Sequence, residues 1–567
     1  MTTTSRTLVD SPRRHRDAGT SWIWALTLAA VLIGATVLLL AIGEEPYHID
    51  ELRQVRAYEG PVGWIITKSF QQTQPPLDSL LNAAAQRVIG VGDWQQRALS
   101  VFFGIGSLLL FGWLLIRARL GFGAPVAVLL LALSPLLVSV TAYARPYALP
   151  LFLLLVFVLS SDLWLRNDTR WAIPAIYASA LVLPLSRTVE PPIALAAVIV
   201  VLLIWRYAVP ERPERTIWVP VSAAALGLVF VAAPVALRMR QEVTGFTESS
   251  LVPSMDQLRR LATDLIPALG DAFPWWPLVL VVVVLAFVHP TSRGLISEAW
   301  WFWVLALVAV GFAVVFFARV PISQPYYTRY TFSWWPPFAF IGGAITTAIL
   351  STQTRRALTI AGTAAAALAL VAAGMVLTLR TDLTTTSNAD WKAAGEAISS
   401  YTSSDTTVFF DHTRSFGSYR TAFAGRIRYV DRERLIPLTQ DVVSRPDLAG
   451  EDGPVAIMVL GNPPHVPGWD RIEVDAFWLY IPKVPTYGRA SSIDALLLFA
   501  DALGPDNGTA MVLGAASLAA DLGDVERACR IIEDHLTEVD DGLSSRIEDF
   551  MQRVSSTAPW FEKCGTF

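Results

Sequence analysis

The amino-acid sequence predicts a mainly α-helical, polytopic membrane protein with a C-terminal α/β plus helical domain outside the membrane. Hydrophobic residues make up 53 % of the 567 residues and charged residues 16 %, well below the roughly 25 % of an average soluble domain. In the first two thirds of the chain, apolar runs of roughly 20 residues recur, long enough to cross a bilayer core about 30 Å thick. The last third is much more polar, which is typical of a domain that folds in water.

The apolar runs predict about eleven transmembrane helices. They cover residues 22–42, 96–116, 121–141, 146–165, 171–186, 191–209, 216–237, 275–289, 299–318, 330–350 and 357–379. A further run, 77–89, is too short to cross, and we expect it to lie at the surface or to re-enter. Arginines precede the first span and fill the short loops of one side, so we expect the N-terminus in the cytoplasm and everything after residue 379 outside the cell membrane.

We divide the chain into a transmembrane domain, 1–380, an extracytoplasmic α/β domain, 381–490, and a helical segment, 491–567. A helix is expected to begin within 390–399, and the apolar runs 407–410 and 455–459 predict buried strands. The two cysteines, Cys529 and Cys564, lie in the predicted outer part, where a disulfide is permitted; two free buried thiols are the alternative.

Two adjacent acids, Asp50 and Glu51, follow the first span directly. If the segment is helical, Arg53 lies on the same face as Asp50, three residues on. A carboxylate at the membrane surface can take a proton from a hydroxyl as a general base, and an arginine can hold a phosphate with its planar fork of donors. Taken alone, these residues favour an N-cap and a first-turn acid at an interfacial helix.

Single arginines also stand at the predicted outer ends of spans, where charges are costly unless paired or functional. They are Arg145, Arg187, Arg319 and Arg329. Aimed at a phosphate leaving group, they would stabilise its developing charge; the alternative is snorkelling at the interface. Nearby Tyr143, Tyr147 and Tyr327 can stack on a sugar or belong to the aromatic belt of the membrane surface. We expect Trp300, Trp301 and Trp303 to be belt residues of the inner side.

The order of these motifs resembles that of the GT-C membrane glycosyltransferases. The acidic pair is followed by Gln74-Pro75-Pro76-Leu77, an arginine at the start of the second span, Ser134-Pro135 and Arg145-Pro146-Tyr147-Ala148-Leu149. Later segments, Tyr327-Thr328-Arg329-Tyr330 and Ala389-Asp390-Trp391, also match motifs of the superfamily. The resemblance is to the protein-mannosyltransferase-like and aminoarabinose-transferase-like branch (glycosyltransferase family 39/83-like), and it covers about residues 20–190 well.

The resemblance implies a GT-C fold and roles for several residues. Asp50 matches the catalytic base, Glu51 the neighbour that orients it or the sugar, and Arg53 an arginine that contacts the donor phosphate. Gln74 is a substrate-binding candidate but departs from the pattern, because relatives often have His or a basic residue there; Lys68 or an arginine would then hold the phosphate. Some relatives bind metal near this loop, so a divalent cation beside His48, Asp50 and Glu51 is an option, and no other cofactor is expected.

The expected activity is transfer of a hexosyl or pentosyl group from a polyprenyl-phosphate donor to an extracytoplasmic glycan, lipid or protein of the cell envelope. A transporter or flippase of lipid-linked sugars and a non-catalytic scaffold are the alternatives. The net charge of −4 argues against a nucleic-acid partner. With four lysines among 44 basic residues, the composition is typical of GC-rich genomes such as those of actinobacteria, which favours an arabinosyl- or mannosyltransferase using decaprenyl phosphate.

Overall fold

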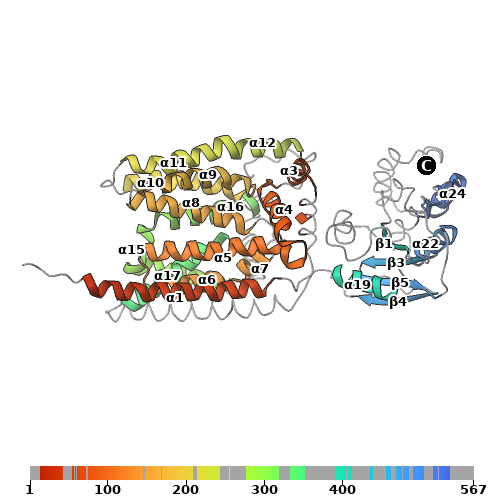
Figure 1. Ribbon diagram of the computed structural model, residues 1–567, viewed down its shortest axis with the longest axis horizontal. Coiled ribbons are helices and arrows are strands. Elements are labelled where there is room, and N and C mark those ends of the chain that lie inside the picture. The colour runs from red at the N-terminus through yellow and green to blue at the C-terminus, as the bar shows by residue number, and fades with distance from the viewer. Residues whose placement is uncertain are drawn as a thin grey trace, which may run out of the picture. The chain divides into compact units, whose positions relative to one another are not determined.

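The computed structural model of the chain divides into two compact units. Unit 1 comprises Met1–Glu44 and Gly60–Thr385, and unit 2 comprises Glu45–Glu59 and Thr386–Phe567. Unit 1 is a bundle of helices and unit 2 is built around a β-sheet (Figure 1). Apart from single positions, the structure describes residues 13–42, 60–71, 74–142, 147–167, 169–208, 214–242, 276–317, 333–351, 391–402, 407–410, 435–437, 455–460, 468–474, 477–483, 489–503 and 523–536; Glu51, Gln54, Val55 and Tyr58 are described individually.

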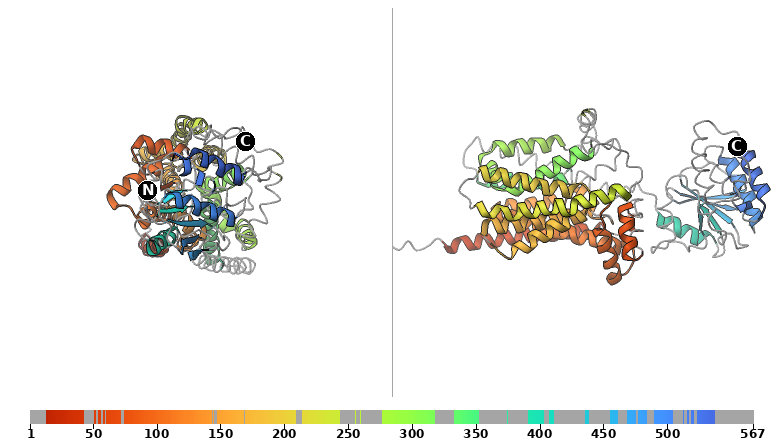
Figure 2. Two further views of the ribbon diagram at one scale, coloured as in Figure 1. Left: turned by 90° about the vertical axis from the view of Figure 1, so that its right-hand side faces the viewer. Right: turned by 90° about the horizontal axis from the view of Figure 1, so that it is seen from above.

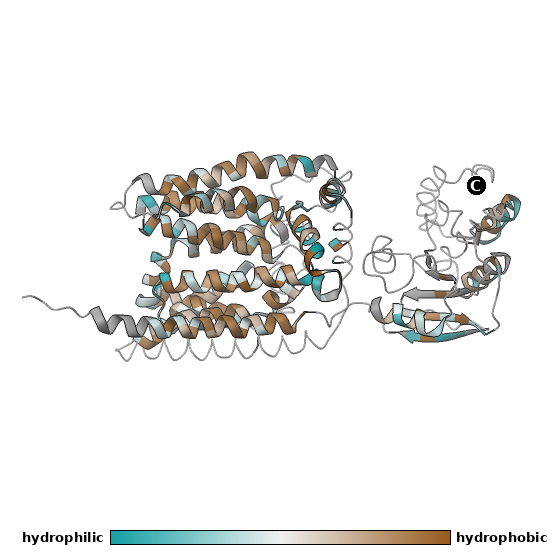
Figure 3. Ribbon diagram, in the orientation of Figure 1, coloured by the Kyte–Doolittle hydropathy of each residue, from teal (hydrophilic) through white to brown (hydrophobic). Residues whose placement is uncertain are grey.

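Most helices of unit 1 run side by side, as two perpendicular views show (Figures 1 and 2), but Pro290–Glu298 is turned by 89° from the helix before it. The helices of this bundle follow one another along the chain. They are α1 (Arg13–Leu40), α5 (Asp93–Arg117), α6 (Gly123–Ala132), α7 (Pro135–Ala142), α8 (Ala148–Asn167), α9 (Ala172–Val182) with the 3-10 turn η1 (Leu183–Leu185), α10 (Glu190–Ala208), α11 (Glu214–Gly227) with the π-turn η2 (Leu228–Ala232) and α12 (Ala233–Glu242), α14 (Trp276–Val288), α15 (Pro290–Glu298), α16 (Trp300–Phe317) and α17 (Trp335–Ser351). Apolar residues predominate along them, and hydrophilic segments gather near their ends (Figure 3).

The helical membrane architecture is confirmed. By length and composition, five described helices can cross a membrane, or up to seven if the bent pairs α6–α7 and α14–α15 each count as one span. Three shorter apolar helices accompany them, and each of the first ten predicted spans coincides with one or more of these elements. The predicted span 357–379 lies outside the described residues, so the total of eleven stays a prediction.

Two glycines allow helices α6 and α17 to approach closely. A Cβ atom added at Gly343 would lie 2.6 Å from the carbonyl oxygen of Gly123, far inside van der Waals contact. Small residues at such crossings let helix backbones pack together in membranes, where apolar surface alone gives helices no preference for each other over lipid. The α6–α17 crossing therefore depends on the absence of side chains at these two positions.

Two short helices lie across one end of the bundle. They are α3 (Val62–Gln71) and α4 (Leu77–Ile89), and α4 has the bounds predicted for the run that is too short to cross. Leu77 of α4 packs with Phe103 of α5 and Ala148, the first residue of α8. Phe70 of α3 packs with Val235 of α12. This end of the bundle is the one that the sequence predicts to face outward.

An ion network joins helices at the opposite end. Asp162 of α8 is 1 % exposed and accepts from Arg117 Nε at 2.8 Å, from Arg166 Nε at 2.7 Å and from Trp300 Nε1 at 3.3 Å. Trp301 is likewise buried, with its ring edge-on to Phe340. The expectation that Trp300 and Trp301 belong to an exposed aromatic belt is therefore wrong, because neighbouring helices cover them.

Unit 2 holds a five-stranded mixed sheet. Its strands are β1 (Thr407–Phe410), β2 (Leu435–Pro437), β3 (Val455–Leu460), β4 (Trp469–Val474) and β5 (Phe477–Pro482), in the order β2-β1-β3-β5-β4. Strand β1 pairs in parallel with β2 and β3, while β5 is antiparallel to β3 and β4. The strands predicted at 407–410 and 455–459 are confirmed.

Helices flank this sheet. Phe499 of α22 (Arg489–Leu503) meets Trp469 and Tyr480 edge-on, and α19 (Trp391–Tyr401), the helix predicted near residue 390, contacts β4 and β5. Helix α24 (Val525–Leu536) carries Cys529, which is disulfide-bonded. The sequence has one other cysteine, so of the two alternatives for the cysteines the structure bears out the disulfide.

Candidate functional site

The structure describes five of the predicted site residues: Glu51, Lys68, Gln74, Tyr147 and Arg187. Lys68 Nζ donates to Gln71 Oε1 at 2.9 Å and lies 4.5 Å from the ring centroid of Trp64. The other predicted site residues lie outside the described residues, and their roles stay predictions. They are His48, Asp50, Arg53, Tyr143, Arg145, Arg319, Tyr327 and Arg329. Glu51 belongs to unit 2 and is described by itself, whereas the other described residues belong to unit 1 and are described with the residues that surround them.

Glu51 is helical and fully buried. Gln54 and Val55, one turn further on, are helical too and almost completely buried, as expected if the segment after the first span is a helix. A carboxylate without exposure to water requires hydrogen bonds or an opposite charge to offset its lost hydration. An acid that merely marks the start of a surface helix would stay exposed, so the burial of Glu51 favours a more specific role.

Arg187 lies between η1 and α10 and is held on two sides. Its Nη1 donates to Oε1 of Glu190, three residues on and the first residue of α10. Its guanidinium carbon lies 4.3 Å from the ring centroid of Tyr147, which directly precedes α8. Acid at a helix start is favoured by the helix dipole, and a guanidinium over an aromatic face is attracted by the ring. The structure thus brings together two predicted residues, Arg187 and Tyr147.

The Arg187–Glu190 pair is buried, with exposures of 9 % and 5 %. Removing both charges from water carries a large desolvation cost, and attraction between them offsets it only when the remaining donors and acceptors are satisfied. The pair therefore fixes a cation at the start of α10.

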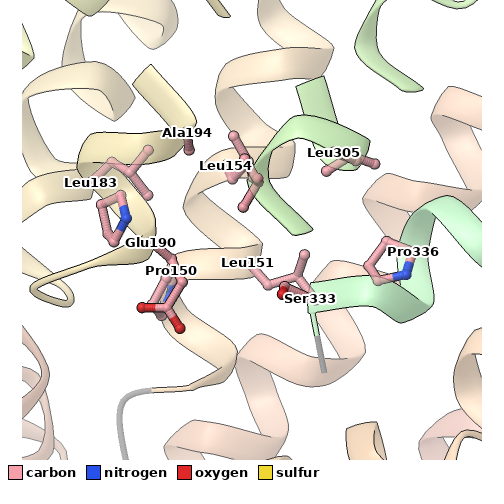
Figure 4. A pocket seen from close by; sticks show the side chains of 11 residues that line it. Pro150, Leu151, Leu154, Leu183, Glu190, Ala194, Leu305, Ser333 and Pro336 are labelled. Atoms are coloured by element: carbon pink, nitrogen blue, oxygen red, sulfur yellow. The ribbon is translucent and has the colours of Figure 1, made fainter. Parts of the chain in front are cut away.

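A pocket opens beside this pair. It is lined by Pro150, Leu151, Leu154, Leu183, Glu190, Pro191, Ala194, Leu305, Val308, Ser333 and Pro336, from α8, η1, α10, α16 and the start of α17. In the part of the chain that the structure describes, Glu190 Oε2 and Ser333 Oγ have no hydrogen-bond partner. Figure 4 shows these two oxygen-bearing side chains toward the lower edge of the view, with Leu154 and Leu305 above them.

Sequence reasoning did not single out Glu190 or Ser333. The spacing Arg187-x-x-Glu190 at the start of a span was the available signal for Glu190, because residues three apart meet on a helix. Ser333 carries no local signal, since it reaches the pocket only through the packing of α17 against the other helices.

A buried polar stripe joins α4 to α5 at the same end of the bundle. Asp78, Asn82 and Gln86 follow at four-residue spacing on one face of α4, and Asn82 Nδ2 donates to Asp78 Oδ2 at 3.2 Å. Gln86 donates to Gln96 in the first turn of α5, beside Arg97, which is almost fully buried. The arginine that opens the second span is therefore part of the interior and does not reach into the interface.

Gln74 lies just before α4, where the resemblance implies a cation in relatives. Its backbone N–H donates to Ser69 O at 2.9 Å, and its side-chain Oε1 is buried without a partner among the described residues. Elsewhere within the described ranges, no group of three or more His, Cys, Asp or Glu side chains is arranged to hold a metal ion. The cation option at the first loop involves His48 and Asp50, which those ranges do not include.

Comparisons with known proteins give fold likeness alone. No protein-family model and no curated protein matches the sequence. ArnT from Cupriavidus metallidurans, bound to undecaprenyl phosphate, is 14 % identical, with 82 % of this chain and 98 % of that chain covered and a TM-score of 0.48. The oligosaccharyltransferase of Archaeoglobus fulgidus, in complex with Zn and sulfate, is 13 % identical, with 77 % and 68 % covered and a TM-score of 0.41.

Proposed function

We propose that this chain is a membrane glycosyltransferase that moves a glycosyl group from a polyprenyl-phosphate donor to a hydroxyl of an extracytoplasmic glycan, lipid or protein of the cell envelope. The observation that carries the proposal is the buried Arg187–Glu190 pair, held against Tyr147 at the end of the bundle crossed by α3 and α4. This arrangement presents a fixed cation at the end of a membrane bundle, where the phosphate of a lipid donor would lie.

Asp50 is the proposed general base. It takes the proton of the acceptor hydroxyl while the hydroxyl oxygen forms a bond to the anomeric carbon. The bond from that carbon to the phosphate oxygen breaks, its electron pair stays on the oxygen, and polyprenyl phosphate leaves. Direct displacement inverts the anomeric centre, and Glu51 orients Asp50 or the sugar.

Arginines stabilise the leaving phosphate in this proposal. Negative charge grows on the phosphate oxygens in the transition state, and cations already fixed in place lower its energy without reorganising. Arg187 is the described member of this set, and its position is fixed by Glu190 and Tyr147 before any donor arrives. The remaining proposed members are Arg53, Arg145, Arg319 and Arg329.

A transfer assay on the full-length protein in lipid nanodiscs tests this function. The donor is first identified by mass spectrometry of lipid extracts from a deletion strain, where an unused lipid-phosphate sugar should accumulate. With that donor, Asp50→Asn should abolish transfer and keep donor binding, whereas Arg187→Gln should weaken donor binding. Arg170→Gln, an exposed arginine at the other end of the bundle, is the control. Near-normal transfer by Asp50→Asn would remove Asp50 as the base, and transport of the lipid without transfer would favour the flippase alternative.

A further inference from the structure

We propose that the pocket between Glu190 and Ser333 receives the hydroxymethyl group of a hexopyranose and so selects hexopyranosyl over pentopyranosyl substrates. The inference rests on the proposed function, since it names the class of sugar that the same site would handle. It starts from two buried atoms and from the size and lining of the space between them.

The two atoms are Glu190 Oε2 and Ser333 Oγ. Both side chains are more than nine-tenths buried, at 5 % and 8 % exposure, and both line the pocket. The other carboxylate oxygen of Glu190 is used by Arg187, while Oε2 and the serine hydroxyl have no partner within the described part of the chain. A carboxylate oxygen accepts and a hydroxyl both donates and accepts, so together they complement a ligand hydroxyl.

The rest of the lining is apolar. Prolines, leucines, alanine and valine from four helices and η1 supply it, among them Pro150, Leu151 and Pro336. Such a lining offers nothing to a phosphate or a second charge but suits a methylene group. The occupant that matches both parts of the pocket is a short carbon stem ending in a hydroxyl.

The size of the pocket narrows the occupant further. Its cavity volume is about 30 Å³. Pockets that enclose a whole small ligand have roughly 300–1,000 Å³, so this space is too small for a sugar ring and admits only a small substituent. A hydroxymethyl group, one carbon and one oxygen, is such a substituent. The ring would therefore stay outside, with one substituent inside.

This fit predicts discrimination between sugars. A pentopyranose lacks the exocyclic hydroxymethyl group of the matching hexopyranose and would leave both buried oxygen atoms unpaired. Sites that hydrogen-bond a ligand hydroxyl from buried groups reject analogues without it much more strongly than apolar sites reject a missing methylene. The pocket thus selects hexopyranosyl over pentopyranosyl substrates.

Matched sugar pairs test the inference. The full-length protein in nanodiscs is titrated, with saturation-transfer NMR as readout, using methyl glycosides of mannose and lyxose, of glucose and xylose, and of galactose and L-arabinose. Within each pair the sugars differ only in the hydroxymethyl group. We expect the hexoside of at least one pair to bind roughly tenfold more tightly than its pentoside, as one hydrogen bond to a charged group provides.

Variants assign that preference to the pocket. Ser333→Ala removes the hydroxyl, and Ala194→Val fills the space. Each variant should lower the affinity for the hexoside to that for the pentoside and should leave the affinity for the pentoside unchanged. Ser161→Ala is the matched control, because Ser161 is also buried with an unpartnered hydroxyl in the described region but does not line the pocket. The inference is overturned if no pair is discriminated, or if Ser161→Ala has the effect of Ser333→Ala.

The hexose belongs to the donor or to the acceptor, and a short-chain donor separates the two. Citronellyl-phosphoryl mannose is compared with citronellyl phosphate: if Ser333→Ala weakens only the first, the pocket holds the donor sugar, and if it weakens only methyl hexosides, the pocket holds the acceptor. The transfer assay is read independently. Discrimination without transfer contradicts the proposed function alone, and transfer without discrimination contradicts the pocket alone.

Discussion

At the scale of single residues, the informative feature is a buried ion pair, Arg187–Glu190, because burial leaves such a pair little net contribution to stability. Arg187 and Glu190 are both nearly withdrawn from solvent, and Tyr147 covers one face of the guanidinium. Replacing a buried ion pair by apolar side chains of similar size is often neutral or stabilising. A role in ligand binding therefore explains this ion pair, at the end of the bundle crossed by α4, better than a role in stability does.

A double-mutant cycle separates those explanations. Arg187→Met should lower the free energy of unfolding by roughly 3 kcal/mol, because Glu190 is left as an unpaired buried charge. Arg187→Met with Glu190→Met should recover most of that loss, since no charge remains, yet should still fail to bind the lipid-phosphate donor. Denaturant unfolding in detergent and donor titration measure the two properties. A double variant that stays as unstable as the single one would show that the pair is structural.

Asp162 provides the contrasting case at the other end of the bundle. It accepts hydrogen bonds from two arginines and a tryptophan on three helices. Asp162→Asn leaves Arg117 and Arg166 without their carboxylate, and a loss of roughly 3 kcal/mol in unfolding free energy is expected. Donor affinity of the folded fraction should stay within about twofold, because no residue of the candidate pocket is in this network. A large loss of donor affinity in Asp162→Asn would contradict this prediction and would show that the Asp162 network and the candidate site are coupled.

At the scale of elements, the α6–α17 crossing sets how closely the bundle closes. The backbones of Gly123 and Gly343 meet there, and α17 leads directly from Ser333 and Pro336 of the pocket. Because tightly packed interiors respond to added atoms by shifting neighbours, a change at this crossing acts on the helix that carries one wall of the pocket.

Glycine substitutions test how closely α6 and α17 approach each other. Gly343→Ala should destabilise the protein by roughly 1–3 kcal/mol, because the new methyl group overlaps the carbonyl of Gly123. Gly294→Ala in α15 is the control: no atom lies within 4 Å of a Cβ there, so the change should be neutral or stabilise by roughly 0.5–1 kcal/mol through helix propensity. Thermal unfolding of the two variants side by side gives the comparison, and equal effects would contradict the crossing.

At the scale of the whole molecule, sequence patterns predicted the positions of helices and strands better than they predicted which residues pack against each other. The run 77–89 predicted α4 and the run 407–410 predicted β1, because periodicity and length are local properties. The sequence predicts a belt position for Trp300, which is in fact buried, because a tryptophan at a span end has the same local pattern whether lipid or a helix covers it. Glu190 and Ser333 come from segments more than 100 residues apart, and no local pattern pairs them.

The disulfide at Cys529 bears on the orientation of the whole chain, which the arginine pattern alone predicts. Disulfides persist outside the cytoplasm and are rare within it, so a bond at Cys529 fits a C-terminal unit outside the membrane. In intact cells, a membrane-impermeant maleimide should label neither cysteine before reduction and should label both after an impermeant reductant such as TCEP. Alkaline phosphatase fused after residue 402 should be active, and fused after Arg117 inactive, because that enzyme folds only where disulfides form. Activity of the Arg117 fusion with inactivity of the other would invert the orientation and, with it, move α3, α4 and the candidate site to the cytoplasmic side, where an extracytoplasmic acceptor is out of reach.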